Sequence, residues 1–519
     1  MAALQQLRMA DRARVLWVDA VCINQQDIPE RGEQVKLMAE IYHSASQVVV
    51  WLGEAHSNST LAFKLIQKLA PVAGGEESPQ SQQSQNASAI RPVDLTDVEN
   101  AAWVALDALY WRPWFTRVWV IQEIAVSRSA VIMCGADIET FDSFCAVTNY
   151  ISQHGLTAMT TAGTLRIQSL MMTRLNFQQK IEILLMNLLV NFRMYQATNA
   201  VDKVYALLNL ANNTIIQPDY SMEAKDVYSK VAREFLAQSL LVLSFNCDPN
   251  WKAQDGIVSW APDWSCRPRE VAFLSRKRLR PWQAGGQGPH VIRFSEDSRT
   301  LFAQGRVIDK LRTVGEGYAY SDVNFSHLSQ DAYGKILGKL DSTEEVTKYF
   351  HQRRWRGWEH LVLKLQSYPA TGENIRTVFQ KILIANADFD AYEGSRSLPS
   401  LETMFDAFRK YEWHRVPQRP ATPEGQTEYG YYQTYMYYAV TASSGRTVFS
   451  TKRGYAGLAP YSSRPGDYVV VLHGGGTPYI LRKSKRSENF IFMGEAYLHG
   501  FMDGEGIDDI NSVQEFAIV

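Results

Sequence analysis

The pattern of apolar and polar residues near the N-terminus predicts a strand, an amphipathic helix and a second strand. The two strands are expected at Val15 to Val21 and at Gln47 to Leu52, which are apolar along nearly their whole length. Such runs are typical of parallel strands that are covered on both faces. Between them, Val35, Met38 and Tyr42 recur at helical spacing. The segment therefore predicts a right-handed βαβ unit.

The residues before the predicted helix carry a start signal. Asp27 and Glu30 have the spacing of a capping box, and Pro29 falls in the first turn, where its missing N–H has no cost. Two further polar residues, Asp19 and Asn24, follow the first predicted strand. Ligands of open α/β sheets bind beyond the carboxyl ends of the strands, so both residues are candidate ligand contacts. The alternative is that they organise the loop through local backbone hydrogen bonds.

The same reading continues to residue 135. Residues 73–92 are rich in Gly, Ser and Gln and predict a disordered insertion. A helical pattern follows at residues 98–110, and a second helix is expected from Arg117 to about Ser127, with Thr116 as its cap. Ala130 to Met133 then predict another buried strand.

The remainder of the chain divides into a helical part and a β-rich end. Residues 136–245 are mainly helical in pattern. Strands are expected at Gly445–Thr451, Tyr468–Leu472, Tyr479–Arg482 and Phe490–Tyr497. The three glycines at 474–476 would either cradle a phosphate or form a hairpin turn. The hairpin is favoured because no helix start follows them.

Composition removes several classes of function. The chain has 519 residues, 46% of them hydrophobic, and 53 basic residues against 54 acidic ones. A near-zero net charge argues against a general nucleic-acid binder. Two clusters of basic residues lie at 276–280 and 353–358, and the second also contains tryptophans. Solvated helix faces would explain both clusters without nucleic-acid binding. No partner of that kind is predicted.

The five cysteines and ten histidines show no metal-ligand spacing, so neither a metal nor a resident cofactor is predicted. Scattered cysteines indicate reduced thiols in a cytoplasmic protein. The N-terminal residues lack the apolar core of a signal peptide, and no apolar run approaches the ~20 residues of a membrane span.

Three segments resemble motifs of the fungal heterokaryon-incompatibility (HET) family. The first is VLWVDAVCINQQDIPERGEQVKLMAEIYHSASQVVVWLG at residues 15–53, the second is RPWFTRVWVIQEIAVSRSAVIMCG at residues 112–135, and the third is ATNAVDKVYALLNLA at residues 197–211. WAPDWS at 260–265 and the last 90 residues resemble regions found downstream in long HET proteins. The resemblance implies a role in non-self recognition and regulated cell death. It also implies an earlier strand with a YxALSYxWG-like motif, which the chain lacks, so the sheet is expected to be truncated.

A second resemblance concerns Glu123. The arrangement W-F-x-R-x-W-x-x-Q-E is similar to the S-x-W-C-x-x-E-L segment of Toll/interleukin-1-receptor (TIR) domains, whose glutamate serves NAD hydrolysis in the active members. Carried over, Glu123 would be the catalytic carboxylate, with Asp19, Asn24 and Trp119 lining the pocket, and NAD would be a substrate rather than a cofactor. The fold implied is a TIR-like or flavodoxin-like parallel sheet.

The residues around Glu123 also admit a structural interpretation. The helix from Val118 to Val126 is apolar except for Gln122 and Glu123, which predicts a buried helix. A buried carboxylate must be paired or must line a cleft. Arg112 and Arg117 are therefore candidate partners in a structural ion pair. Asp202 and the tryptophans of WAPDWS have structural interpretations too, as a helix-start residue and as fillers of an interdomain seam.

The chain is thus predicted to be an α/β protein with four regions: a TIR-like module at 1–135, a helical region at 136–270, a variable α-rich region at 271–430 and a β-rich region at 431–519. The expected function is HET-type cell death with NAD glycohydrolysis. The alternatives are a non-catalytic protein that binds partners or itself through the HET fold, and an accessory protein of a fungal biosynthetic cluster. Self-association or protein partners are expected in either of the first two cases.

Overall fold

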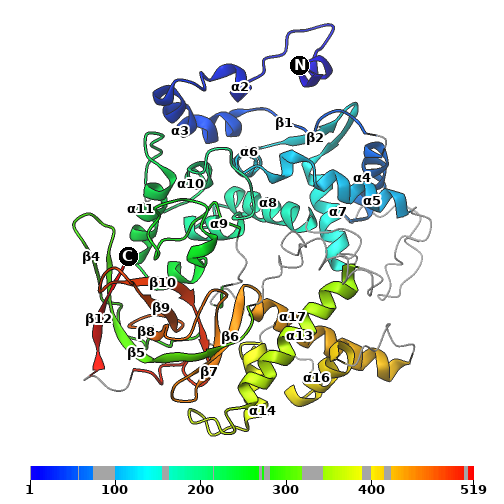
Figure 1. Cartoon of the computed structure of the whole chain (residues 1–519). Coiled ribbons are helices and arrows are strands. Elements are labelled where there is room, and N and C mark those ends of the chain that lie inside the picture. Colours follow the sequence, from blue (N-terminus) through cyan, green and yellow to red (C-terminus); the bar gives the residue numbers. More distant parts are fainter. Residues whose placement is uncertain are drawn as a thin grey trace, which may run out of the picture. The chain divides into compact units, whose positions relative to one another are not determined.

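The computed structural model describes residues 2–56, 58–73, 100–154, 163–213, 216–267, 272–273, 281–317, 343–387, 399–413, 422–507 and 512–519, with backbone alone at residues 100, 343–352 and 413. The chain forms two compact units, Met1–Ala224 and Lys225–Val519. Helices and strands are labelled in Figure 1. Most of the predicted insertion at 73–92 and the basic cluster at 276–280 lie outside the described residues.

The sheet of the first unit has three strands in the order β1-β2-β3 within the described residues. β1 (Val48–Trp51) runs parallel to β2 (Ala130–Cys134), with Val48 opposite Ala130. β3 (Asp137–Thr140) turns back antiparallel to β2 after Gly135. The predicted strands at 47–52 and 130–133 are confirmed. One parallel pair fits an α/β fold, whereas the finer TIR-like assignment remains a prediction.

The predicted strand from Val15 to Val21 is wrong. The backbone at Val18 is extended, but Asp19–Cys22 form the short helix α2, and neither flank pairs with β1. Val15 and Val21 are 97% and 75% exposed. An apolar run favours a strand only where a neighbouring strand supplies hydrogen bonds and covers its side chains, and nothing in the described first unit does so here.

Besides α2, the first unit contains ten described helices, of which α4 and α7 pack against the strands. The ten are α1 (Ala2–Leu7), α3 (Ile28–Ser44), α4 (Ser59–Ala73), α5 (Asn100–Tyr110), the 3-10 helix η2 (Pro113–Thr116), α6 (Trp119–Ala125), α7 (Phe141–Gln153), α8 (Gly163–Gln178), α9 (Leu185–Asn191) and α10 (Asp202–Leu208). The predicted start of α3 is confirmed, because the Asp27 carboxylate accepts the Glu30 backbone N–H at 3.0 Å. The expected helical region after 136 is confirmed as well.

The predicted cap of α6 is wrong. The Thr116 hydroxyl donates to the Pro113 carbonyl and closes the last turn of η2, and Val118 stands at the start of α6 without a side-chain cap. The backbone hydrogen bonds at the start of α6 come from Gln196 instead. Gln196 forms a parallel β-bridge with Arg117, and its carbonyl accepts the Val118 N–H at 2.8 Å. A tertiary partner thus replaces the local cap.

The second unit is built on a sheet of nine strands in its described part. The order β5-β12-β10-β9-β8 returns to β5 through a β5–β8 pairing, so these strands close into a barrel (Figure 1). The strands are β4 (Ile292–Phe294), β5 (Leu301–Val314), β6 (Arg446–Thr451), β7 (Ala456–Pro460), β8 (Tyr468–Leu472), β9 (Tyr479–Lys483), β10 (Phe490–Glu495), β11 (Tyr497–Leu498) and β12 (Gln514–Ile518). The four strands predicted near the C-terminus are confirmed.

Two features of this unit differ from the sequence-based expectation. β4 and β5 lie in a region expected to be α-rich, yet β5 is the strand that joins β8, β12 and β6. Residues 431–443, expected within a β-rich end, belong to helix α17 (Pro423–Ser443). The sequence of β5 gives only a weak strand signal, because its alternation of buried and exposed side chains depends on which strands pair with it in the barrel.

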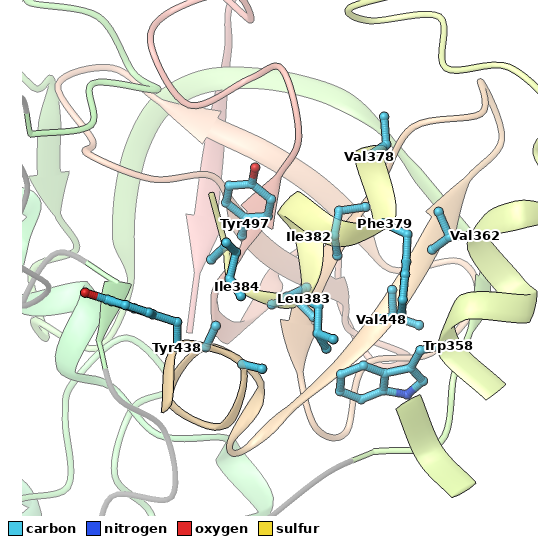
Figure 2. Packing of buried hydrophobic residues seen from close by; sticks show 14 of the residues in the cluster. Trp358, Val362, Val378, Phe379, Ile382, Leu383, Ile384, Tyr438, Val448 and Tyr497 are labelled. Carbon is cyan, nitrogen blue, oxygen red and sulfur yellow. The ribbon is translucent and has the colours of Figure 1, made fainter. Parts of the chain in front are cut away.

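The helices described in the second unit are α11 (Ala224–Leu236), the 3-10 helices η4 (Leu240–Phe245) and η5 (Pro249–Trp251), α13 (Thr343–Leu363), α14 (Ile375–Leu383), α16 (Leu401–Phe408) with a π-turn η9 (Arg409–Trp413), and α17. Of these, α13, α14, α16 and α17 pack against β6, β7 and β11 in one apolar core, and a separate apolar cluster lies among the barrel strands. Figure 2 shows Trp358 of α13 and Phe379 of α14 beside Val448 of β6. Trp355 and Trp358 are fully buried, so the second basic cluster offers no tryptophan for base stacking. Across the described residues, no helix combines the length and apolar character that a membrane crossing requires.

Candidate functional site

The carboxylate of Glu123 is buried, as the sequence predicts for its helix. Glu123 is 9% exposed and its neighbours from Val120 to Ala125 are buried as well. The Trp114 indole N–H donates to Glu123 Oε2 at 3.4 Å. Burial raises the pKa of Glu123 to about 7, the Arg117 guanidinium opposes this rise, and the Asp19 carboxylate adds to it. The group is therefore poised to bind or release a proton near neutral pH.

The Glu123 carboxylate interacts electrostatically with three side chains: Asp19, Tyr42 and Arg117. Burial, followed by the charges of Glu123 and Asp19, raises the pKa of Tyr42 and keeps its hydroxyl protonated. The ring of Tyr42 meets Trp17 edge to face at 5.6 Å between centroids. Arg117 is exposed and Asp19 half-buried, so the cluster joins a buried carboxylate to groups that reach solvent.

Arg112, the other expected partner of Glu123, lies elsewhere. Its guanidinium donates to the carbonyls of Leu52 and Glu54, at 3.2 and 3.3 Å. It therefore fixes the turn that follows β1. Arg117, one of the two candidates named from the sequence, is the cation that acts on Glu123.

Local hydrogen bonds hold the loop between α2 and α3. The Asn24 side chain accepts the Gln26 N–H at 3.2 Å, and the Asn24 N–H donates to Glu30. The Asp19 carboxylate accepts the Ala20 N–H at 2.7 Å. Asn24 thus makes local contacts of the kind expected for an organiser of the loop. Asp19 makes such a contact and also acts on Glu123.

Trp119 is engaged with a residue of the third motif. Its indole N–H donates to Asp202 Oδ2 at 3.2 Å, and the Tyr220 hydroxyl donates to Asp202 Oδ1 at 2.8 Å. The Arg31 guanidinium lies over the Tyr220 ring, 4.0 Å from its centroid. Burial raises the pKa of Asp202, opposed by these two hydrogen bonds. The structure therefore places Glu123, Trp119 and Asp19 in one region of the first unit.

Sequence reasoning missed Tyr42 and Tyr220 as neighbours of the site. The sequence predicts Tyr42 only as part of the packing face of α3, although the hydroxyl of a tyrosine in an apolar stripe is a signal for a polar contact. Tyr220 gave no local signal, because its position depends on the return of residues 217–221 to α3. Among the described residues, no His, Cys, Asp and Glu side chains gather in a metal-binding group.

The glycines at 474–476 connect β8 to β9, which pair antiparallel, so the predicted hairpin is confirmed. The N–H of Gly474 donates to the Gly285 carbonyl and that of Gly475 to the Leu472 carbonyl. A Cβ on Gly285 would meet the Leu472 carbonyl oxygen at 2.0 Å, so the chains touch here. These N–H groups are consumed by the protein itself and do not offer a phosphate cradle.

The tryptophans of WAPDWS are core residues of the second unit. Trp260 and Trp264 are buried, and the Trp260 indole donates to the Arg299 carbonyl at 3.1 Å. Asp263 between them accepts hydrogen bonds from the N–H groups of Ala253, Gln254 and Ser265 and from the Ser265 hydroxyl. This motif therefore has a structural explanation.

Comparison with known proteins agrees with the motifs. Residues 1–123 match the family model of the heterokaryon incompatibility protein (HET) domain, and residues 355–519 match that of the Het-6 β-barrel domain. The chain is 25% identical to heterokaryon incompatibility protein 6, OR allele, of Neurospora crassa, over 97% of this chain and 83% of that protein. No solved structure matches. The first unit thus contains a segment similar to the HET domain, and the strands of the second unit lie in a segment similar to the Het-6 β-barrel domain.

Proposed function

We propose that this protein acts in fungal non-self recognition and regulated cell death by hydrolysing NAD at the nicotinamide–ribose bond. The observation that carries the proposal is the buried Glu123 carboxylate, whose pKa of about 7 is set by burial and by the neighbouring Arg117 and Asp19. Such perturbed groups cluster at functional sites. The TIR-like sequence around Glu123 suggests the reaction.

The chemistry fits the groups present. When the bond from the anomeric carbon to the nicotinamide nitrogen breaks, the electron pair leaves with nicotinamide, and positive charge develops on the ribose as an oxocarbenium ion. Ionised Glu123 would stabilise that charge, as carboxylates do in glycosidases. Water then adds to the anomeric carbon and loses its proton, giving ADP-ribose. Asp19, the second carboxylate in the cluster, is our candidate acceptor for that proton.

The test is nicotinamide release by the purified protein at high concentration, for wild type, Glu123→Gln and Glu33→Gln. Glu33 is exposed on α3 and pairs with Lys36, so its variant is a matched control for the loss of a carboxylate from the same unit. We expect release by wild type and by the control, and none by Glu123→Gln. Equal release by all three would exclude Glu123, and no release by folded wild type would exclude the reaction.

One observation favours a second candidate, a non-catalytic role through self-association. Within the described residues β1 pairs on one side only, and an open strand edge is a template for another strand. Val15 and Val21, both highly exposed, add apolar surface in the same unit. In that case Val49→Lys on β1 and Val21→Lys should lower the mass measured by light scattering, while Glu123→Gln should not.

A further inference from the structure

Residues 197–221 lie beyond the segment that matches the HET model, yet they contribute to the same compact unit. Asp202 is the residue through which they do so. Its two carboxylate oxygens accept from Trp119 on α6 and from Tyr220, and Tyr220 in turn packs under Arg31 of α3. One side chain of α10 thus links three parts of the sequence.

The contacts of Asp202 reach the surroundings of Glu123 through two helices, α6 and α3. Trp119 and Glu123 are one turn apart on the same face of α6. Arg31 and Tyr42 are about three turns apart on α3, and so they share a face of that helix. Fixing Trp119 and Arg31 therefore fixes the orientation of the two helices that bring Glu123 and Tyr42 together.

Neighbouring amides strengthen the same arrangement. The Asn209 side chain, just after α10, donates to the Val35 carbonyl of α3 at 3.0 Å. The buried Gln122 amide, in the orientation that satisfies both its atoms, donates to the Ala206 carbonyl at 3.2 Å and accepts the Ala39 N–H at 2.8 Å. The segment that follows Asp202 is thus hydrogen-bonded to α3 through Asn209 and to α6 through Ala206.

We propose that Asp202 is a positioning residue for the Glu123 site: by holding Trp119 and Tyr220 it sets the place of α6 against α3. The inference rests on the proposed function for its catalytic consequence alone. It extends the functional module past residue 123 to the segment around Tyr220. A fragment that ends after β2 would contain every residue predicted from the sequence to form the site, and would lack what orients them.

The experiment compares Asp202→Ala, Asp202→Asn and Tyr220→Phe in the full chain. Asp226→Asn is the control, since Asp226 is an exposed carboxylate in the first turn of α11 and belongs to the second unit. The readouts are the Glu123 carboxyl pKa from ¹³C NMR, the Trp119 indole ¹⁵N–¹H signal, assigned with Trp119→Phe, and the kcat and KM of nicotinamide release. Thermal unfolding reports whether each variant is folded.

For Asp202→Ala we expect the pKa of Glu123 to fall by about one unit or more toward its usual value, because α6 is released from its buried position. The Trp119 signal should move upfield, and kcat should fall about tenfold or more with a smaller change in KM. Asp202→Asn should retain most of each, since its amide oxygen can still accept from Trp119 while its NH₂ donates to the Tyr220 hydroxyl. Tyr220→Phe should give a smaller change in the same direction.

The outcomes are separable. If Asp202→Ala does not fold, Tyr220→Phe and Asp202→Asn decide the question. Folded variants with an unchanged Glu123 pKa and Trp119 signal would overturn the proposal. If wild type releases no nicotinamide and the two NMR readouts still respond to Asp202, the positioning role stands and the NAD hydrolysis proposal fails.

Discussion

Arg446 Nη2 lies 2.9 Å from Glu495 Oε1 inside the second unit, where the two side chains are 0% and 2% exposed. Arg446 stands on β6 and Glu495 on β10. The Phe273 N–H also donates to Glu495 Oε1, and the guanidinium lies over the Phe273 ring, 3.7 Å from its centroid. The pair therefore joins two strands and a connecting segment in a region without solvent.

Breaking this pair should be costly. We expect Glu495→Gln to lower the free energy of unfolding of the second unit by about 3–5 kcal/mol, because it leaves the buried Arg446 guanidinium without its counter-charge. Arg446→Met should cost less, because burial raises the pKa of Glu495 to about 7 and the carboxyl left behind can take up a proton. The measurement is urea denaturation. Arg293→Met, which breaks the exposed Arg293–Glu515 pair, is the control and should cost about 1 kcal/mol or less. Equal losses would contradict the interpretation.

The titration of Glu123 should make stability depend on pH. In the folded state Glu123 keeps its proton up to about pH 7, against an ordinary value of 4.5. The stabilising contribution is complete below about pH 4.5 and is lost as the pH rises through 7, by on the order of 3 kcal/mol. Glu123→Gln lacks this loss, so it should gain stability relative to wild type between pH 5 and pH 8. Hydrogen exchange of the α6 amides would measure this, and parallel pH curves would rule the titration out.

Gly135, which follows β2, should not tolerate a side chain. Its φ is +57°, and a Cβ would lie 2.7 Å from Ala55 Cβ and 2.9 Å from the Ala55 backbone nitrogen. We expect Gly135→Ala to destabilise the first unit by about 1–3 kcal/mol. Gly32→Ala is the matched change, since Gly32 lies in α3 with open space around it and alanine there should stabilise by about 0.5–1 kcal/mol. Thermal unfolding of the two variants should shift in opposite directions.

The core that joins the helices of the second unit to β6, β7 and β11 depends on Trp358. This side chain is 1% exposed, and its indole N–H donates to the Glu316 carbonyl at 2.8 Å. Trp358→Ala should cost about 3–5 kcal/mol. Tyr437→Ala, on α17 but 60% exposed, should cost under about 0.5 kcal/mol. The measurement is thermal unfolding followed by the near-UV signal of the tyrosines in the strands. An unfolding midpoint that is the same in Trp358→Ala and in wild type would show that the strands do not depend on this core.

Much of the fold could be predicted from local sequence. The start of α3 follows from Asp27, whose carboxylate is close enough in sequence to cap the helix that it precedes. β1, β2 and most C-terminal strands follow from apolar runs between turns. The burial of Glu123 follows from the apolar residues on every side of its helix. In each case the cause and the effect lie within a few residues of each other.

Other features were decided only by tertiary structure, because their partners are distant in sequence. Whether Val15 to Val21 forms a strand depends on a neighbour that could supply hydrogen bonds, and no apolar pattern contains that information. β5 is recognisable only by its barrel partners. The cation that acts on Glu123 had to be chosen between Arg112 and Arg117, and the Trp119–Asp202 contact spans 83 residues. The sequence by itself determined that a carboxylate would be buried in α6, and the packing of α3, α6 and α10 decided what surrounds it.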